Sequence, residues 1–466
     1  RARPQKALSL QKQLRQKRSN FMKILFISLG CDKNLADSEE MLGLLTAGGH
    51  EITDDETQAD AIVINTCCFI KDAKEESVET ILEMAEYKKT GSCHALIVTG
   101  CMAQRYQKEI IEEVPEVDAV LGTTSYGDIV KALEEAVAGN HFEEFRDIDY
   151  LPDTGSKRVL TTGGHFGYLK IAEGCDKHCT YCIIPKLRGR FRSVPMERLV
   201  AQAEDMAEQG VKELILVAQE TTVYGKDLYG KKSLHILLKK LCEIRGIRWI
   251  RILYCYPEEI YDELIETIRD EKKICHYLDI PIQHASDRIL KRMGRRTSKQ
   301  ELIDIVGKLR KEIPDIVLRT TLITGFPGET EEDHEELKEF VDEMEFDRLG
   351  VFTYSPEENT PAAEMADQVP EEVKEERRDE LMELQQEISY DRGQDRIGQE
   401  LLVMIEGKVA DESAYIGRTY GDAPKVDGYI FVQTGELLMT GDFAKVRVTG
   451  ALEYDLIGVL SDEYTE

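Results

Sequence analysis

Between residues 22 and 145 the chain alternates short apolar runs with longer amphipathic segments, and this alternation constrains the fold more than any other feature. The apolar runs occupy residues 24–28, 61–65, 95–99 and 118–121. Continuous apolar strands separated by helices are typical of a parallel sheet that helices cover on both faces. We therefore predict an α/β domain built on a doubly wound parallel sheet.

Three of these predicted strands end in the same way, with a cysteine two or three residues beyond the apolar run. The endings are Leu29-Gly-Cys31, Asn65-Thr-Cys67 and Thr99-Gly-Cys101. The carboxyl ends of the strands in a doubly wound sheet line one crevice, so the three thiols should converge. A lone cysteine usually acts as a small buried hydrophobe, which is the interpretation given to Cys68 and Cys93. Three converging cysteines instead predict an iron–sulfur cluster site.

A second alternation of strands and helices fills residues 160–390, after a predicted linker at 141–160. Six parallel strands with intervening helices predict a partial (βα)6 barrel that is open on one side. In such barrels chemistry gathers on the loops that follow the strands. The predicted strands are residues 167–171, 213–218, 250–254, 277–280, 318–323 and 349–353.

The loop after the first of these strands carries Cys175, Cys179 and Cys182 in a C-x3-C-x2-C pattern. Three thiolates can bind three irons of a four-iron cluster and leave the fourth without a protein ligand. A structural zinc site is the alternative, with His178 as a conceivable fourth ligand. Zinc sites generally use C-x2-C pairs, and no second pair lies nearby. The spacing therefore favours an iron–sulfur cluster.

The sequence pattern of the last part of the chain predicts a helix at the end of the core, followed by a small β domain. Residues 370–392 have the pattern of a charged amphipathic helix. Apolar runs at 401–405, 428–432 and 443–448, with glycines between them, predict a small antiparallel β domain over 396–466.

Composition and charge restrict the ligands that the chain can bind and its cellular location. The chain has 466 residues and a formal net charge of -29, which argues against direct nucleic-acid binding. No apolar run approaches the roughly 18 residues of a membrane span. Eleven cysteines without a secretory signal indicate a reducing, cytoplasmic location. Residues 1–21 are basic and lack acids, so we expect a disordered extension, with a transit peptide as the alternative.

These motifs together resemble the radical S-adenosylmethionine (SAM) methylthiotransferases, over nearly everything after Met22. The resemblance includes the phrases Ser28-Leu-Gly-Cys-Asp-Lys-Asn34, Asp279-Ile-Pro-Ile-Gln-His284 and Thr324-Gly-Phe-Pro-Gly-Glu-Thr330. It implies a methylthiotransferase N-terminal domain, a radical SAM core and a tail called a TRAM domain. It also implies SAM and two 4Fe-4S clusters. The cluster on the C-x3-C-x2-C loop would cleave SAM, and the cluster on the strand-end cysteines would present the sulfur.

The same resemblance implies further contacts to SAM. Tyr181 stands where the superfamily places an aromatic ring against the adenine, and Gln219 and Glu220 stand where it contacts the amino group. Gly325 and Glu329 lie in a stretch that resembles the superfamily's glycine-containing segment near the adenine. Ordinary packing is the alternative for Tyr181, and a simple turn for Gly325. No residue is predicted as a general base.

The resemblance leaves two substrates open, an aspartate β carbon of small-subunit ribosomal protein twelve and an adenosine of transfer RNA. From residue 400 to 466 the tail has five Lys or Arg against thirteen Asp or Glu. An acidic tail repels RNA and suits a basic ribosomal protein, so we predict the protein substrate. A reductant such as flavodoxin or ferredoxin is the other expected partner. A non-catalytic iron–sulfur carrier is the third hypothesis.

Overall fold

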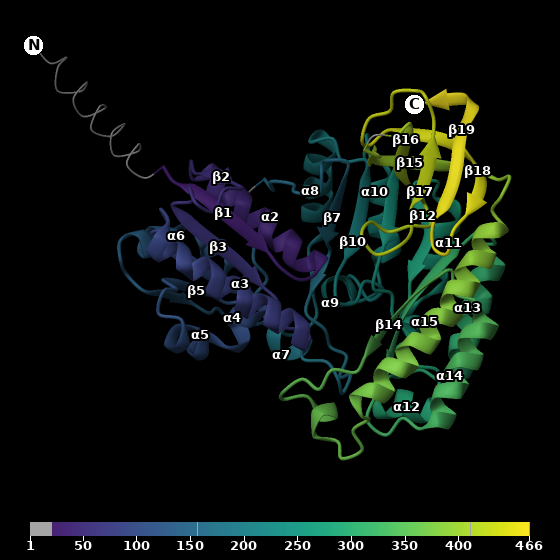
Figure 1. Cartoon of the computed structure of the whole chain (residues 1–466), viewed down its shortest axis with the longest axis horizontal. Coiled ribbons are helices and arrows are strands. Elements are labelled where there is room, and N and C mark those ends of the chain that lie inside the picture. The colour runs from purple at the N-terminus through teal and green to yellow at the C-terminus, as the bar shows by residue number, and fades with distance from the viewer. Residues whose placement is uncertain (1–20, 156, 411, 466) are drawn as a thin grey trace, which may run out of the picture. The chain divides into compact units, whose positions relative to one another are not determined.

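Two parallel sheets and one small barrel contain most strands of the computed structural model (Figure 1), which describes residues 21–155, 157–410 and 412–465. The chain divides into two units. The first ends at Thr161 and also contains Lys186–Arg190, and the second contains Thr162–Pro185 and Phe191–Glu466. All but the last residue of the predicted basic extension, 1–21, lies outside the described residues. No helix in the described ranges is long and apolar enough to cross a membrane.

The first unit is built on one six-stranded parallel sheet with the order β2-β1-β3-β4-β5-β6. Strand β1 lies between β2 and β3, so the chain reverses its direction across the sheet at this point. This order confirms the predicted doubly wound sheet and places its switch point at β1 and β3. The strands are β1 (Lys23–Ser28), β2 (Glu51–Thr53), β3 (Ala61–Thr66), β4 (Ala95–Gly100), β5 (Ala119–Leu121) and β6 (Phe142–Glu144).

Both faces of this sheet are buried, as the continuous apolar runs predict. Ala61 and Val63 belong to a core that includes side chains of α2 and α6. Ile62 and Ile64 point to the opposite face and are equally inaccessible to solvent. The helices of this unit are α2 (Asp32–Ala47), α3 (Lys71–Thr90), α4 (Cys101–Arg105), α5 (Gln107–Glu113) and α6 (Ile129–Val137), with a 3-10 turn η1 (Tyr126–Asp128).

Two strands of this sheet were not predicted. Strands β2 and β6 are three residues long and partly exposed, and they lie at the two edges of the sheet. Short edge strands bury little side-chain surface, so they need no apolar run and leave none in the sequence. Strand β6 falls inside the segment 141–160 that was expected to be a linker.

The second unit contains the predicted partial barrel. Its six strands form one parallel sheet in the order β14-β13-β12-β11-β10-β7, with β7 and β14 at the edges. All six predicted strands are confirmed, with small differences at their ends. They are β7 (Phe166–Lys170), β10 (Glu213–Val217), β11 (Trp249–Ile252), β12 (Ile274–Asp279), β13 (Val317–Thr324) and β14 (Arg348–Thr353).

Helices alternate with these strands along the chain. Side chains cap two of them in a reciprocal way: Ser298 with Glu301 at α13, and Thr330 with Asp333 at α14. A short antiparallel pair, β8 (Ala172–Glu173) with β9 (Arg192–Ser193), flanks the cysteine loop. The elements between the strands are α7 (Ile184–Arg188), α8 (Met196–Glu208), α9 (Lys226–Tyr229), α10 (Leu234–Cys242), η2 (Pro257–Glu259), α11 (Asp262–Asp270), α12 (Asp287–Arg292), α13 (Lys299–Glu312), α14 (Glu331–Met344) and η3 (Pro361–Glu364).

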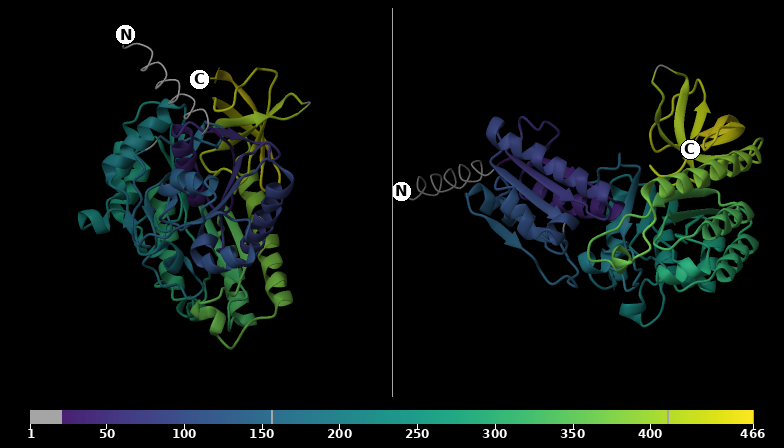
Figure 2. Two further views of the ribbon diagram at one scale, coloured as in Figure 1. Left: turned by 90° about the vertical axis from the view of Figure 1, so that its left-hand side faces the viewer. Right: turned by 60° about the horizontal axis from the view of Figure 1, so that its bottom comes forward.

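Helix α15 (Glu371–Gln394) confirms the predicted charged helix and leads into the tail. The tail is a closed five-stranded barrel in the order β15-β16-β17-β19-β18, drawn in yellow in Figure 2. Four of its five pairings are antiparallel, but β17 pairs with β19 in parallel. The prediction of a purely antiparallel unit was therefore wrong for one pair. The strands are β15 (Glu400–Lys408), β16 (Ala414–Thr419), β17 (Ile430–Gln433), β18 (Phe443–Ala451) and β19 (Leu456–Thr465).

A buried group of charges joins the tail barrel to the parallel sheet. Glu213 of β10 accepts from Arg251 of β11 at 2.8 Å and from Arg418 of β16 at 2.6 Å, and all three side chains are inaccessible to solvent. The carboxylate lies between two guanidinium groups, so its pKa is lowered by Arg418 and Arg251 against the opposing effect of burial. Glu213 is the first residue of its strand, so the tail packs at the amino ends of the strands.

Candidate iron–sulfur and SAM sites

The three strand-end cysteines follow three neighbouring strands of the first sheet. Cys31 follows β1 and caps α2, Cys67 follows β3, and Cys101 is the first residue of α4 directly after β4. Strands β1, β3 and β4 are adjacent and parallel, so their carboxyl ends share one edge. The structure thus brings these cysteines together at the switch point, as the sequence predicts.

Two glycines permit the close approach of the chain at this edge. Gly30 has a φ of +85°, and a Cβ there would lie 2.8 Å from the Sγ of Cys67. Gly100 has a φ of +94°, and a Cβ there would lie 2.3 Å from the Oδ1 of Asn65. Neither position can accept a side chain without moving a neighbour. Gly30 before Cys31 and Gly100 before Cys101 are therefore required by these two turns.

The donor set fits a cluster of several irons. Cys31 is exposed, whereas Cys67 and Cys101 are buried, and none of the three forms a disulfide within the described residues. Burial, then Cys101 and Cys31, raise the pKa of Cys67 to about 12, so three thiolates here need a compensating cation such as iron. Among the described residues, no three His, Cys, Asp or Glu side chains are arranged around a single metal ion. Each cysteine on a cluster binds a different iron, which suits a wider spacing.

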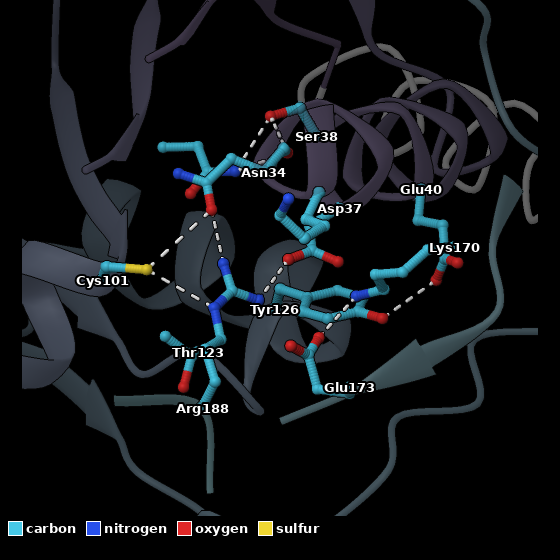
Figure 3. Close-up of polar contacts among 12 residues, drawn as sticks. Asn34, Asp37, Ser38, Glu40, Cys101, Thr123, Tyr126, Lys170, Glu173 and Arg188 are labelled. Atoms are coloured by element: carbon cyan, nitrogen blue, oxygen red, sulfur yellow. Dashed lines mark hydrogen bonds and ion pairs between the residues drawn. The ribbon is translucent and has the colours of Figure 1, made fainter. Parts of the chain in front are cut away.

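A polar network stands beside these thiols, and sequence reasoning did not predict it (Figure 3). The amide nitrogen of Asn34 donates to the carbonyls of Leu29 and Thr66, both at 3.0 Å, and so connects the ends of β1 and β3. Its Oδ1 accepts from Arg188, which also donates to Asp37 at 2.7 Å and to the Sγ of Cys101 at 3.4 Å. The motif that contains Asn34 was recognised, but nothing near Arg188 in the sequence signals this role.

In the second unit, the C-x3-C-x2-C loop is fixed by its own backbone and by the segment after α12. The amide of Lys177 donates to the Sγ of Cys175 at 3.4 Å, and the amide of Cys182 donates to the carbonyl of Cys179 at 3.0 Å. Thr180 donates through its amide to the carbonyl of Met293 at 2.9 Å. Burial raises the pKa of Cys175 to about 12. The loop gathers three desolvated thiols, which fit a cluster better than a zinc ion.

Aromatic rings and a cation lie beside this loop. The hydroxyl of Tyr256 is 3.8 Å from the Sγ of Cys179, and the Arg295 guanidinium lies 4.3 Å from the centroid of the Tyr256 ring. Tyr181 packs edge-on against Phe326, with ring centroids 6.5 Å apart. The side chain of Arg295 is 6% exposed, and its Nε and Nη1 have no partner among the described residues. Sequence reasoning missed Arg295 because it lies in an ordinary basic run.

Gln219 and Glu220 follow β10 and reach the same strand edge as the loop. Gln219 donates to the Oε1 of Glu173 at 3.0 Å. One oxygen of Glu220 accepts from the amide of Thr222 at 2.9 Å, and the other, Oε2, has no partner within the described ranges. Burial raises the pKa of Glu220 to about 7. Glu220 is therefore a buried carboxylate with one acceptor ready for a cationic ligand.

Gly325 and Glu329 have partners within the protein. Gly325 has a φ of +68°, and a Cβ there would lie 2.1 Å from the Cγ of Lys374 on α15. The carboxylate of Glu329 accepts from Arg377 at 2.9 Å and from the amide of Phe326 at 3.2 Å. These contacts account for both residues structurally, and their contact with SAM stays a prediction.

Three family models match successive parts of the chain. The model described as uncharacterized protein family UPF0004 matches residues 23–122, the radical SAM superfamily matches 169–341, and the TRAM domain matches 397–460. These ranges follow the doubly wound sheet, the partial barrel and the closed barrel in turn.

Relatives cover nearly the whole chain. A protein of Lachnoclostridium phytofermentans named ribosomal protein uS12 methylthiotransferase RimO is 67% identical over 94% of this chain and 99% of its own length. A protein of the same name from Pelotomaculum thermopropionicum is 52% identical over 94% of this chain and 99% of its own.

Solved structures share the fold at low sequence identity. The radical SAM methyltransferase TsrM of Kitasatospora setae is similar with a TM-score of 0.53 and 14% identity, over 73% of this chain and 76% of that chain. On the relatives and the three family models together, the chain belongs to the radical SAM methylthiotransferase family, among the ribosomal protein uS12 methylthiotransferases called RimO.

Proposed function

We propose that this protein transfers a methylthio group to the β carbon of an aspartate in ribosomal protein uS12. The observation that carries the proposal is the presence of two cysteine triplets, one after the parallel strands β1, β3 and β4 and one on the loop that follows β7 and β8. A carrier of iron–sulfur clusters has no need of the barrel that carries Cys175, Cys179 and Cys182. The relatives named for uS12 modification support the same activity.

Cys175, Cys179 and Cys182 would hold the radical-generating cluster. Bound SAM and a reduced four-iron cluster together supply a radical that removes hydrogen from an unactivated carbon. The cysteine loop would fix the cluster through its backbone contacts, and the fourth iron would stay open because no fourth thiol lies in the loop. Tyr256 and Arg295 would line the same side of the cluster as Cys179.

Glu220 would bind the amino group of SAM, with Gln219 beside it. A buried carboxylate with one unpartnered oxygen gains most from a cationic ligand, because the ligand replaces the hydration that burial removed. Tyr181 would lie against the adenine, and Gly325 and Glu329 would shape the nearby segment. The internal partners of Glu329 favour support of this segment over direct contact.

Cys31, Cys67 and Cys101 would hold the second cluster and leave one of its irons open to the sulfur that is transferred. Asn34 would keep the cysteine-bearing strand ends together through its two carbonyl contacts. Cys68 would take no part. Its pKa is raised mainly by burial, as expected of a core thiol.

The tail supports a protein substrate over transfer RNA. Arg418 is buried against Glu213, and Arg447 pairs with Glu400 at 3.1 Å. Two of the five basic residues of the tail are therefore engaged by carboxylates, which leaves fewer positive charges to neutralise phosphate. A ribosomal substrate supports a cytoplasmic location for the enzyme, where ferredoxin or flavodoxin would supply electrons.

The test is a competition under anaerobic conditions. The reconstituted enzyme, SAM, a sulfide source and dithionite are offered uS12 and total transfer RNA together, and mass spectrometry follows the methylthio group on each. We expect the mass increase on the uS12 aspartate. The Cys68→Ala variant serves as the matched control and should retain the activity. Methylthio-adenosine without modified uS12 would overturn the assignment.

A further inference from the structure

One buried cation stands directly against a thiol of the strand-end triplet. The side chain of Arg188 on α7 is 2% exposed, and its Nε donates to the Sγ of Cys101 at 3.4 Å. Arg188 follows Cys182 by six positions in the sequence, yet the segment Lys186–Arg190 belongs to the first unit. The fold of the first unit therefore places the charge of Arg188 at the strand-end triplet, Cys31, Cys67 and Cys101.

Hydrogen bonds from three of its nitrogens fix the orientation of the Arg188 guanidinium. Nη1 donates to Asp37 at 2.7 Å and Nη2 donates to the Oδ1 of Asn34, while Nε faces Cys101. Asn34 and Asp37 are three residues apart on α2 and so lie on the same side of the helix. Asn34 is in turn fixed by the carbonyls of Leu29 and Thr66. A planar guanidinium with these partners cannot turn away from the sulfur without losing several hydrogen bonds.

Such an arrangement has a specific electrostatic effect on an iron–sulfur cluster. Hydrogen bonds to the sulfurs and the local net charge set the reduction potential of a cluster. Reduction adds one electron and makes the cluster more negative. A positive charge and an N–H donor at a ligand sulfur stabilise the reduced form more than the oxidised form. The effect is strong where water is absent, as at a side chain that is 2% exposed.

We propose that Arg188 is a positioning residue that raises the reduction potential of the cluster on Cys31, Cys67 and Cys101 through its contact with Cys101. This inference rests on the proposed function, because it assumes that those cysteines hold a cluster. Asp37 holds the guanidinium in place and partly offsets its charge. Helix α7, which follows the C-x3-C-x2-C motif in the sequence, thus supplies a residue that tunes the cluster on Cys31, Cys67 and Cys101.

The experiment measures the cluster on Cys31, Cys67 and Cys101 in a protein that cannot bind the other cluster. The full chain with Cys175, Cys179 and Cys182 replaced by alanine is reconstituted, and its iron content and midpoint potential are measured by an EPR-monitored redox titration. Arg188→Gln, Arg188→Lys and Asp37→Asn are compared in this background. Lys186→Gln is the control, because Lys186 is exposed in the same segment and loses the same charge.

We expect Arg188→Gln to shift the midpoint to a more negative value, Arg188→Lys to shift it less, and Lys186→Gln to leave it unchanged. Asp37→Asn should shift it to a more positive value, because a negative charge is removed. If Arg188→Gln does not retain four irons, the opposite shifts of Arg188→Lys and Asp37→Asn still test the inference.

An unchanged midpoint in iron-loaded Arg188→Gln, an equal shift in Lys186→Gln, or shifts of the same sign in Arg188→Lys and Asp37→Asn would overturn it. Absence of iron from the triple-alanine parent would instead overturn the proposed cysteine ligands, and this inference with them. Iron content therefore reports on the ligands, and the midpoint reports on Arg188.

Discussion

Some buried side chains of this protein have polar atoms that make no hydrogen bond among the described residues. Glu220 illustrates this, since one of its oxygens is held by Thr222 and the other has no partner in the described part of the chain. Arg295 is comparable, with two N–H groups that lack partners among the described residues. Burying a polar atom without a hydrogen bond is costly, so each such atom calls for an explanation, and a bound ligand is one. The sequence places Glu220 at the end of a strand, but only the structure shows which of its atoms is left over.

Replacing Glu220 by glutamine should stabilise the protein without its clusters at neutral pH. Burial raises the pKa of this carboxyl from 4.5 to about 7, so the folded state retains a proton that the unfolded state has released between these values. The wild-type protein therefore loses stability as pH rises from 4.5 to 7, by roughly 3 kcal/mol at most.

The measurement is urea unfolding of wild type and Glu220→Gln at pH 5 and pH 7.5. The variant's advantage in the free energy of unfolding should be larger at pH 7.5 than at pH 5. An equal difference at the two pH values would contradict the assigned pKa.

At the scale of elements, the apolar runs predicted the fold because buried parallel strands must be continuously apolar. All six barrel strands and the central strands of the first sheet were predicted on this basis. The edge strands β2 and β6, and the parallel pairing of β17 with β19, were not. Edge strands bury little, and pairing direction in a closed barrel depends on contacts between distant segments. The cysteines were predicted because strand ends carry a local signal, whereas Arg188 and Arg295 reach their sites through tertiary packing.

The turn between β4 and α4 should tolerate no side chain at Gly100. An alanine there would need both a positive φ and a Cβ 2.3 Å from Asn65 and 2.5 Å from the carbonyl of Thr66. Gly139 after α6 also has a positive φ, of +80°, but a Cβ there meets nothing within 4 Å. Gly139→Ala should therefore cost only the backbone strain of about 1–3 kcal/mol, and Gly100→Ala clearly more.

Urea unfolding and the iron content after reconstitution of both variants give the comparison. We expect Gly100→Ala to lose iron from the second cluster and Gly139→Ala to keep it. Equal losses of stability in the two variants would show that the crowding at Gly100 has no effect.

Within the second unit as a whole, the tail barrel and the parallel sheet share a buried ionic contact. Glu213 lies between Arg251 and Arg418, and Trp249 packs edge-on against Phe443 of the tail with ring centroids 4.9 Å apart. Breaking a buried ion pair leaves a charge that neither water nor a partner compensates. The tail is thus part of the folded body of the core and cannot be treated as an independent attachment.

Arg418→Met should destabilise this unit by about 3–5 kcal/mol, because Glu213 and Glu406 lose a shared partner. Arg447→Gln is the matched control, since it breaks only an exposed pair with Glu400, which water screens. The chain has a single tryptophan, so the fluorescence of Trp249 follows the tail–sheet contact during urea unfolding. A midpoint for Arg418→Met within error of Arg447→Gln would contradict a stabilising role for the buried network.

The separation of the two cluster roles is tested most directly by one variant, Cys67→Ala, in an assay that records two products. Reconstituted wild type and Cys67→Ala are incubated anaerobically with SAM, a sulfide source, dithionite and uS12, and mass spectrometry quantifies 5'-deoxyadenosine and methylthiolated uS12. We predict that 5'-deoxyadenosine still forms while methylthiolated uS12 falls to background, because only the second cluster loses a ligand. Loss of both products, or retention of methylthiolated uS12, would contradict the assignment of separate tasks to the two cysteine triplets.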